Sequence, residues 1–224
     1  MDGNRRYAKE YLDDDIDAGH KLGEKKIEEL MDWCLDLRIK YVTVYAFSSE
    51  NFNRGDDEVN FLMDLSENSF YNIADNPRIH ENRVHIRALG DVQALPENVR
   101  KAIEYAAERT KEYRDFTISV CIAYGGRQEI VAAVKEIARK VRDGEMAVDD
   151  ISEETLSTHM YTSDIPDPDL ILRTSGEVRV SNFLLWQLAY SELYFTDIYW
   201  PGFRRIDLLR AIRTYQQRVR RYGK

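Results

Sequence analysis

The chain has 224 residues, of which 43% are hydrophobic and 32% are charged. This balance excludes a disordered chain, and the length suits one domain with a single core. The net charge of -8 at pH 7 argues against nucleic acid as a partner, so any anionic ligand needs a local basic site.

Cysteine usage and hydropathy exclude two further classes of protein. Only Cys34 and Cys121 are present, one in a helix-like and one in a strand-like stretch, so neither a disulfide framework nor a zinc site is expected. No run of about eighteen apolar residues exists, and the N-terminus lacks the pattern of a signal peptide. We therefore expect a cytoplasmic protein.

Helix and strand patterns alternate along the chain. Apolar residues at helical spacing predict a helix from Leu22 to Leu35, and a β-branched and aromatic run predicts a buried strand from Tyr41 to Phe47. Further helices are expected over 58–73, 97–113, 129–141 and 206–222, and further strands over 84–89, 116–123 and 170–172. The alternation predicts one α/β domain over residues 1–224, with a mostly parallel central sheet flanked by helices.

Polar segments follow three of the predicted strands, where ligands bind in parallel sheets. They cover residues 48–54, 124–127 and 173–182. In the last of these, Arg173 and Arg179 bracket a glycine and can hold a phosphate group, with Ser181 as a further donor. The alternative is a surface loop whose arginines pair with Glu177 and Asp169. In the first segment, the alternative is a helix N-cap at residue 49, 53 or 56.

Two more features carry potential chemistry. The segment Asp2-Gly3-Asn4-Arg5-Arg6 allows a tight turn with backbone N–H groups and arginines directed at an anion, although a loose polar terminus explains its composition equally well. Glu192 is a lone carboxylate in an aromatic run, and such a group is costly to bury unless it is paired or bound to a metal.

Together these segments resemble the cis-prenyltransferases, also called undecaprenyl or polyprenyl diphosphate synthases, from Met1 to Lys224. The resemblance rests on MDGNRRYA at 1–8, GH at 19–20, YAFSSENFNR at 45–54, YGGR at 124–127, DLILRTSGEVRVSNFLLWQ at 169–187, ELYF at 192–195 and WP at 200–201. It implies a Mg²⁺-dependent homodimer that condenses isopentenyl diphosphate repeatedly onto farnesyl or geranylgeranyl diphosphate. The implied product is a long-chain Z-polyprenyl diphosphate, undecaprenyl-like, that serves as a glycosyl carrier lipid and grows in a hydrophobic tunnel.

The resemblance also implies roles for particular residues. Asp2 corresponds to the catalytic carboxylate that handles magnesium and the leaving diphosphate, and Glu192 to a magnesium ligand acting across a dimer interface. Asn51 stands where proton acceptance is often assigned, although a neutral amide is a poor base. The implied substrate-binding residues are Gly3, Asn4, Arg5, Arg6, Tyr7, His20, Ser48, Ser49, Glu50, Phe52, Arg54, Arg173, Arg179, Val180 and Ser181.

The sequence departs from the family at three places. Arg5 and Tyr7 replace a glycine and a tryptophan typical of bacterial enzymes, a pattern closer to archaeal and eukaryotic members. Bacterial relatives usually have an arginine a few residues before the Gly-His pair, whereas residues 14–18 here contain none, so one phosphate contact is missing or comes from Arg5. The sequence also begins at the aspartate motif, so we expect it to lack a short N-terminal strand segment. The last residues, 220–224, resemble a terminal element that reaches the partner subunit.

One alternative of a different class is a non-catalytic scaffold subunit of a heteromeric cis-prenyltransferase. Such subunits usually lack the aspartate and arginine set that is present here, which favours the enzyme. Residues 13–17 fit the DDxxD motif of the all-helical trans-prenyltransferases, but the predicted strands argue for an acidic loop that leads into a helix. We expect no nucleic acid partner and at most a peripheral membrane contact during product release.

Overall fold

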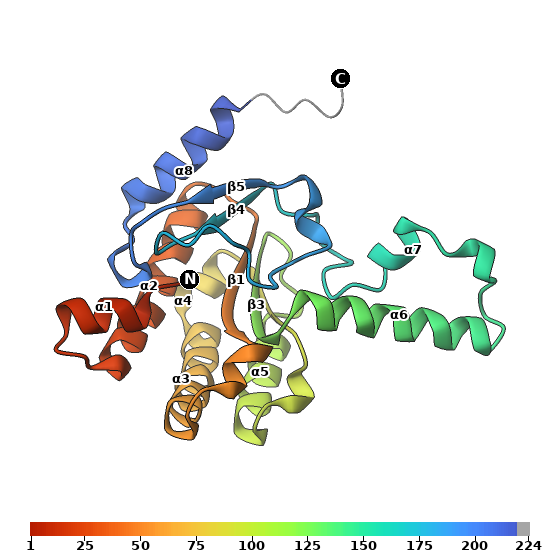
Figure 1. Ribbon diagram of the computed structural model, residues 1–224, viewed down its shortest axis with the longest axis horizontal. Coiled ribbons are helices and arrows are strands. Elements are labelled where there is room, and N and C mark those ends of the chain that lie inside the picture. The colour runs from red at the N-terminus through yellow and green to blue at the C-terminus, as the bar shows by residue number, and fades with distance from the viewer. Residues whose placement is uncertain (219–224) are drawn as a thin grey trace. The chain divides into compact units, whose positions relative to one another are not determined.

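A computed structural model describes residues 1–218 (Figure 1). The chain divides into two compact units. Among the described residues, the first unit combines 1–38, 168–179 and 190–218, and the second combines 39–167 with 180–189.

The second unit is built on a three-stranded parallel sheet. Its strands are β1 (Tyr41–Ser48), β2 (Val84–Leu89) and β3 (Phe116–Tyr124), in the spatial order β1-β3-β2. The central strand β3 is almost wholly buried, as its continuous apolar run predicts. These strands confirm the predicted parallel sheet, and their bounds lie within one residue of those expected.

Two opposite irregularities mark the end of the β1–β3 pairing. Tyr41 pairs with Thr117 near the start of the two strands, and Ser48 pairs with Tyr124 at their ends. The separation in residue number between the partners is the same in both pairs. Between these points the register slips after Tyr45 and slips again after Phe47. The two polar segments that follow β1 and β3 therefore leave the sheet at matching heights.

Helices connect these strands, because neighbouring parallel strands need a crossover. Helices α3 (Asp56–Asp75) and α4 (Pro77–Glu81) lead from β1 to β2, and α5 (Glu97–Thr110) leads from β2 to β3. Helix α3 packs on α5, and α5 packs on β2. After β3 come α6 (Gly126–Arg142) and the short α7 (Glu153–Ser157). Gly55 precedes α3 at the N-cap position, so the three N-caps considered above are wrong.

The first unit contains two helices from the start of the chain and a small parallel sheet. Helix α1 (Asn4–Tyr11) packs on α2 (Ile16–Asp36), and β4 (Leu170–Arg173) pairs with β5 (Glu192–Phe195). Helix α8 (Arg205–Gln217) follows β5. The Asp15 carboxylate accepts a hydrogen bond from the Ala18 N–H and so caps α2. This agrees with the prediction of an acidic loop that leads into a helix, rather than a DDxxD motif.

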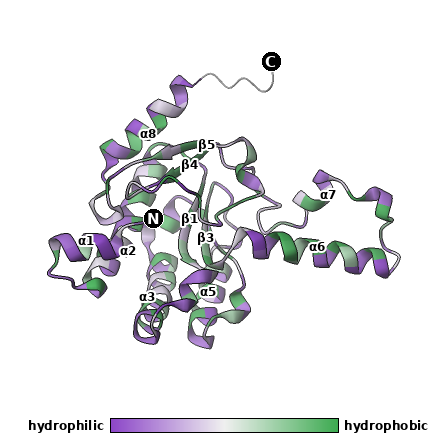
Figure 2. Ribbon diagram, viewed as in Figure 1, coloured by the Kyte–Doolittle hydropathy of each residue, from purple (hydrophilic) through white to green (hydrophobic). Residues whose placement is uncertain are grey.

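The sequence-based boundaries match the structure best where the apolar pattern is long. Figure 2 shows the alternation of polar and apolar residues along the helices that carried those predictions. Helices α1, α4 and α7 and strand β5 were not predicted. Residues 219–224, which include the expected terminal element, lie outside the described residues. Within residues 1–218, no helix has the length and apolar character needed to cross a bilayer.

Candidate active site

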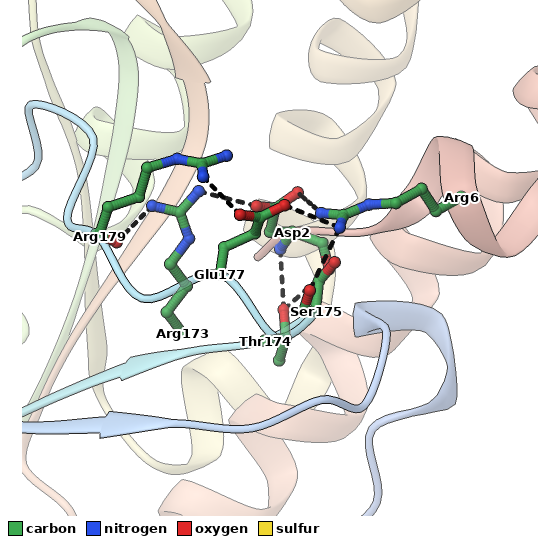
Figure 3. Close-up of polar contacts among 7 residues, drawn as sticks. All are labelled: Asp2, Arg6, Arg173, Thr174, Ser175, Glu177 and Arg179. Atoms are coloured by element: carbon green, nitrogen blue, oxygen red, sulfur yellow. Dashed lines mark hydrogen bonds and ion pairs between the residues drawn. The ribbon is translucent and has the colours of Figure 1, made fainter.

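The Asp2 carboxylate lies between two guanidinium groups of the first unit (Figure 3). Arg173 Nη2 donates to Asp2 Oδ2 at 2.8 Å, and Arg6 Nη2 lies 3.3 Å from Asp2 Oδ1. Burial alone would raise the pKa of Asp2, but the Arg173 hydrogen bond and the charges of Arg173 and Arg6 outweigh it and lower the pKa below its usual value. The carboxylate is therefore ionised at neutral pH.

Glu177 joins the remaining arginine to this cluster. Arg6 Nη1 donates to Glu177 Oε1 at 2.8 Å, and Arg179 Nη1 donates to Glu177 Oε2 (Figure 3). Arg173 in turn donates to the backbone carbonyl of Arg179. The Arg179–Glu177 pair that the surface-loop alternative predicted is thus present, within a cluster of three guanidinium groups and two carboxylates.

Close helix packing fixes the turn that carries Asp2. Gly3 has φ +104°, a left-handed conformation that glycine adopts without strain, and it precedes the first turn of α1. A Cβ on Gly19 of α2 would lie 2.7 Å from the Asn4 backbone carbonyl, so only glycine allows this approach of the two helices. His20 follows on α2 and is buried. Arg5 is exposed on α1, and the Tyr7 ring lies 4.9 Å from that of Tyr11.

The predicted segment after β1 folds as a short 3₁₀ turn, Ser49–Asn53, in the second unit. The Asn51 side-chain oxygen accepts a hydrogen bond from the Ser48 N–H at 3.0 Å, so this oxygen already braces the turn. The Phe52 ring packs edge-on against Phe47 at 4.9 Å between centroids. Arg54 forms an ion pair with Glu58 at 2.8 Å.

Asn182 connects three segments of the second unit. Its Nδ2 donates to Glu50 Oε1 at 2.8 Å and to Gln128 Oε1 at 3.0 Å, and its Oδ1 accepts from the Arg127 N–H at 2.9 Å. Its backbone carbonyl also accepts from the Gly126 N–H at 2.7 Å. Asn182 and the preceding Ser181 both have left-handed φ values, 63° and 48°, and Val180 is half-buried. One side chain thus joins the turn after β1 to the start of α6.

A small pocket opens where the strands of the second unit end. It has a volume of about 180 Å³ and is lined by Ser49, Phe52, Gly90, Asp91, Ala94, Ala123, Gly125, Gln128 and Tyr161. Among residues 1–218, the Ser49 hydroxyl oxygen is one of the buried polar atoms without a hydrogen-bond partner. The volume is far too small for a chain of many isoprene units, so the hydrophobic tunnel stays a prediction.

Glu192 lies at the other end of the small sheet from Arg173. In the parallel register, Leu170 pairs with Glu192 at one end and Arg173 pairs with Phe195 at the other. The Glu192 carboxylate forms an ion pair with Arg218 at 2.5 Å, so its charge is compensated without a metal. Its predicted role as a metal ligand stays a prediction.

The Asp2 carboxylate has the chemistry that Mg²⁺ prefers. Mg²⁺ binds through one or two carboxylates together with substrate phosphate oxygens and water, not through a complete protein cage. The Asp2 side chain is ionised and 32% exposed, and cationic side chains that can hold phosphate surround it. Within residues 1–218 there is no group of three or more His, Cys, Asp or Glu side chains that could hold a metal alone. The arrangement fits a cation that arrives with a diphosphate.

Sequence reasoning gave no role to Thr174 or Asn182, and it did not predict that Glu177 bridges Arg6 and Arg179. Thr174 is 1% exposed, and its hydroxyl contacts the backbone of Asp2. All three residues lie inside the segment 169–187 that carried the resemblance. Their partners are distant in sequence, so only the fold reveals what they contact.

Comparison with known proteins identifies the family. A protein-family model described as putative undecaprenyl diphosphate synthase matches residues 1–223 of the chain. The chain belongs to the undecaprenyl diphosphate synthase family, the cis-prenyltransferases. Membership confirms the predicted family and the prediction of a prenyltransferase that acts in polyprenyl diphosphate synthesis.

Two archaeal cis-prenyltransferases are close in sequence to the whole chain. The protein of Methanocaldococcus jannaschii is 56% identical over 226 residues, covering 100% of this chain and 80% of its own length. The protein of Methanopyrus kandleri is 54% identical over 224 residues, covering 100% of this chain and 82% of its own length. Each is named a tritrans,polycis-undecaprenyl-diphosphate synthase (geranylgeranyl-diphosphate specific).

Two solved structures share the fold. Lavandulyl diphosphate synthase from Lavandula x intermedia, in complex with dimethylallyl diphosphate, has a TM-score of 0.93 at 36% identity and is covered over 95% of its chain. A probable undecaprenyl diphosphate synthase from Campylobacter jejuni has a TM-score of 0.78 at 32% identity, with 91% of this chain covered. These matches confirm the predicted α/β fold class.

Proposed function

We propose that the chain condenses isopentenyl diphosphate repeatedly onto geranylgeranyl diphosphate and releases an undecaprenyl-like Z-polyprenyl diphosphate for use as a glycosyl carrier lipid. The observation that carries the proposal is the ionised Asp2 carboxylate between Arg173 and Arg6, with Arg179 joined through Glu177. The names of the archaeal relatives support geranylgeranyl diphosphate rather than farnesyl diphosphate as the primer.

The arginines of the cluster bind the two diphosphates in this proposal. Arg6 and the N-terminal turn of α1, whose helix dipole favours a negative charge, take the allylic diphosphate. Arg173 and Arg179 take the diphosphate of isopentenyl diphosphate, where planar guanidinium groups match pairs of phosphate oxygens. Arg6 and Arg179 each exchange Glu177 for a phosphate when substrate enters.

Asp2 would hold the required Mg²⁺ against the allylic diphosphate. When bound, the ion acts as a Lewis acid that stabilises the negative charge on the departing group. The allylic C–O bond breaks with its electron pair leaving on the diphosphate, and the double bond of isopentenyl diphosphate then supplies the electrons of the new C–C bond. Loss of one proton forms the new double bond. Because the Asn51 oxygen already accepts the Ser48 N–H, the released diphosphate or water is the better proton acceptor.

A direct assay tests the proposed reaction. The purified protein is incubated with Mg²⁺, labelled isopentenyl diphosphate and, in separate reactions, dimethylallyl, farnesyl or geranylgeranyl diphosphate. We expect incorporation that is greatest with geranylgeranyl diphosphate, disappears with EDTA and yields products of undecaprenyl length. No incorporation with any primer would favour the non-catalytic subunit, and a single short product would refute repeated condensation.

Site variants separate the roles of the carboxylate and the arginines. Asp2→Ala is expected chiefly to lower kcat, whereas Arg173→Ala and Arg179→Ala are expected chiefly to raise KM for isopentenyl diphosphate. Arg142→Ala is the control, because its side chain is 70% exposed and pairs only with neighbouring Asp143 among the described ion pairs. Exchanged kinetic effects would refute the assignment.

We propose that the active species is a homodimer in which Glu192 serves the partner's active site. The support is that Glu192 and Arg173 lie at opposite ends of the β4–β5 pair within one chain. Mixing Asp2→Asn subunits with Glu192→Gln subunits tests this, because one of the two sites in a mixed dimer would regain both carboxylates. Activity no higher than the sum of the separate variants would refute it.

The proposed location is the cytosol, with a peripheral membrane contact only during product release. The two buried free cysteines suit a reducing compartment.

A further inference from the structure

The backbone of Asp2 is held by a single buried hydroxyl group. The Asp2 N–H donates to Thr174 Oγ1 at 2.9 Å, and Thr174 Oγ1 donates to the Asp2 carbonyl at 2.8 Å (Figure 3). The Trp200 N–H donates to the same carbonyl at 3.0 Å. Both backbone polar groups of Asp2 are therefore satisfied by Thr174, with help from Trp200 at the carbonyl.

Two consecutive residues at the end of β4 thus hold the two parts of Asp2. Arg173 binds the carboxylate, and Thr174 binds the backbone from which the carboxylate extends. Thr174 is 1% exposed, so water does not compete for its hydroxyl. The next residue, Ser175, turns into the left-handed region with φ 79° and donates its N–H to the Ile198 carbonyl at 2.8 Å. This bond anchors the turn that follows Thr174.

A carboxylate that stabilises a departing diphosphate must be placed accurately before the reaction, because a displacement of about 1 Å can cost on the order of 10²-fold in rate. The Asp2 side chain has only two rotatable bonds, so its position follows from the backbone and from Arg173. If the Thr174 hydroxyl is removed, the N–H and carbonyl of Asp2 lose their shared partner. The carboxylate then shifts although every group that touches substrate is still present.

We propose that Thr174 is a positioning residue for the Asp2 carboxylate, acting through its two backbone hydrogen bonds. This inference rests on the function proposed for Asp2. Thr174 itself reaches no substrate, because its hydroxyl is fully engaged inside the protein. The expected signature is a loss of kcat at an almost unchanged KM for isopentenyl diphosphate.

Variants of Thr174 test the proposal with the same assay. Thr174→Val replaces the hydroxyl with a methyl group of nearly the same shape, and we expect kcat to fall about 10- to 100-fold with KM for isopentenyl diphosphate within about 3-fold. Thr174→Ser keeps the hydroxyl, and kcat should stay within about 3-fold of the wild type. Thr174→Ala removes both the hydroxyl and the methyl group of the threonine. If the valine variant does not fold, the same fall in kcat is expected in the alanine variant.

Thr110 provides a matched control in the other compact unit. Thr110 is fully buried, and its Oγ1 likewise accepts a backbone N–H, from Ile86 at 3.0 Å, and donates to a backbone carbonyl, of Ala106 at 2.8 Å. Thr110→Val should destabilise the fold to a similar degree and leave kcat of the folded enzyme unchanged. The unfolding midpoint in urea is measured for all variants.

The outcomes separate this inference from the function on which it rests. A low kcat in Thr174→Val and Thr174→Ala, restored in Thr174→Ser and absent in Thr110→Val, supports it. A normal kcat in both hydroxyl-free variants overturns the inference alone, as does an equal loss of kcat in Thr110→Val. An inactive wild type overturns the proposed function and this inference together.

Discussion

The buried Glu129 offers the sharpest test of what holds the second unit together. Glu129 lies on α6 and is 1% exposed. Its carboxylate accepts hydrogen bonds from the Tyr124 hydroxyl at 2.5 Å, from the Tyr161 N–H at 2.8 Å and from Gln187 Nε2 at 3.1 and 3.2 Å. It therefore joins the end of β3, the start of α6, the turn at Tyr161 and the short 3₁₀ helix that begins at Gln187.

The expected cost of removing this carboxylate follows from its partners. A hydrogen bond to a charged group contributes about 1.5–3 kcal/mol, and a buried donor left without a partner costs about 1–3 kcal/mol. Glu129→Ala removes the acceptor from the buried Tyr124 hydroxyl and the half-buried Tyr161 N–H and leaves Gln187 Nε2 with Thr162 Oγ1 alone, while the cost of burying the charge is regained. We expect a net loss of about 3–5 kcal/mol in the free energy of unfolding, a large part of a total that is typically about 5–15 kcal/mol. Glu129→Gln keeps the shape of the side chain, but its amide NH₂ group then faces the hydrogen-bond donors that Glu129 bound. The free energy of unfolding should therefore fall by about 2 kcal/mol.

Urea unfolding monitored by tryptophan fluorescence measures these losses. Trp186 reports on the same unit, because its indole N–H donates to the Ser157 hydroxyl at 2.9 Å near the Glu129 network. Glu136→Ala is the control on the same helix, since its side chain is 42% exposed and pairs with Arg139 at the surface. The control should stay within about 0.5 kcal/mol of the wild type. If Glu129→Ala is no less stable than Glu136→Ala, the reasoning is refuted.

Three further predictions concern charge and backbone. Asn182→Asp places a second carboxylate against Glu50, so the variant should be less stable than the wild type at pH 7 and recover as pH falls toward about 4; an equal loss at both pH values contradicts this. Gly3→Ala should cost more in unfolding free energy than the control Gly144→Ala, because both have positive φ but only the Cβ at residue 3 meets an aromatic ring, at 2.8 Å. Burial would raise the pKa of Asp207, but its arginine partners outweigh this and lower the pKa, so its stabilising effect is fully present above about pH 4 and is lost as the pH falls through the lowered pKa. The difference in unfolding free energy between Asp207→Asn and the wild type should therefore be larger at pH 7 than at pH 3.

The strands and long helices were predictable because their apolar patterns are local. Strand β2 matches its predicted bounds, and α5 begins at the predicted residue. Helix α2 was predicted to begin at Leu22, where the apolar positions at helical spacing begin, but it begins at Ile16 and includes the glycines at 19 and 23, which have a low helix propensity. In the fold those glycines allow close contact with Asn4, so tertiary packing outweighs their local preference. Strand β5 is only four residues long and its pattern is too short to assign.

The candidate site was predictable as a set of residues and not as a set of contacts. The resemblance selected Asp2, Arg6 and Arg173, and these side chains meet in the structure. It could not reveal that Thr174 holds the backbone of Asp2, because the two residues are 172 positions apart and a threonine in a polar loop is unremarkable by composition. It also gave Asn51 a chemical role, whereas its side-chain oxygen is engaged within its own turn.

The paired slips between β1 and β3 limit how this protein can change length during evolution. Each slip shifts one strand by a residue relative to the other, and the second slip cancels the first. Ser48 and Tyr124 are therefore paired in the original register. Deleting one residue from either strand near this point would turn every later side chain of that strand to the opposite face. Tolerated insertions and deletions should therefore occur in both strands at once or be confined to the loops beyond them.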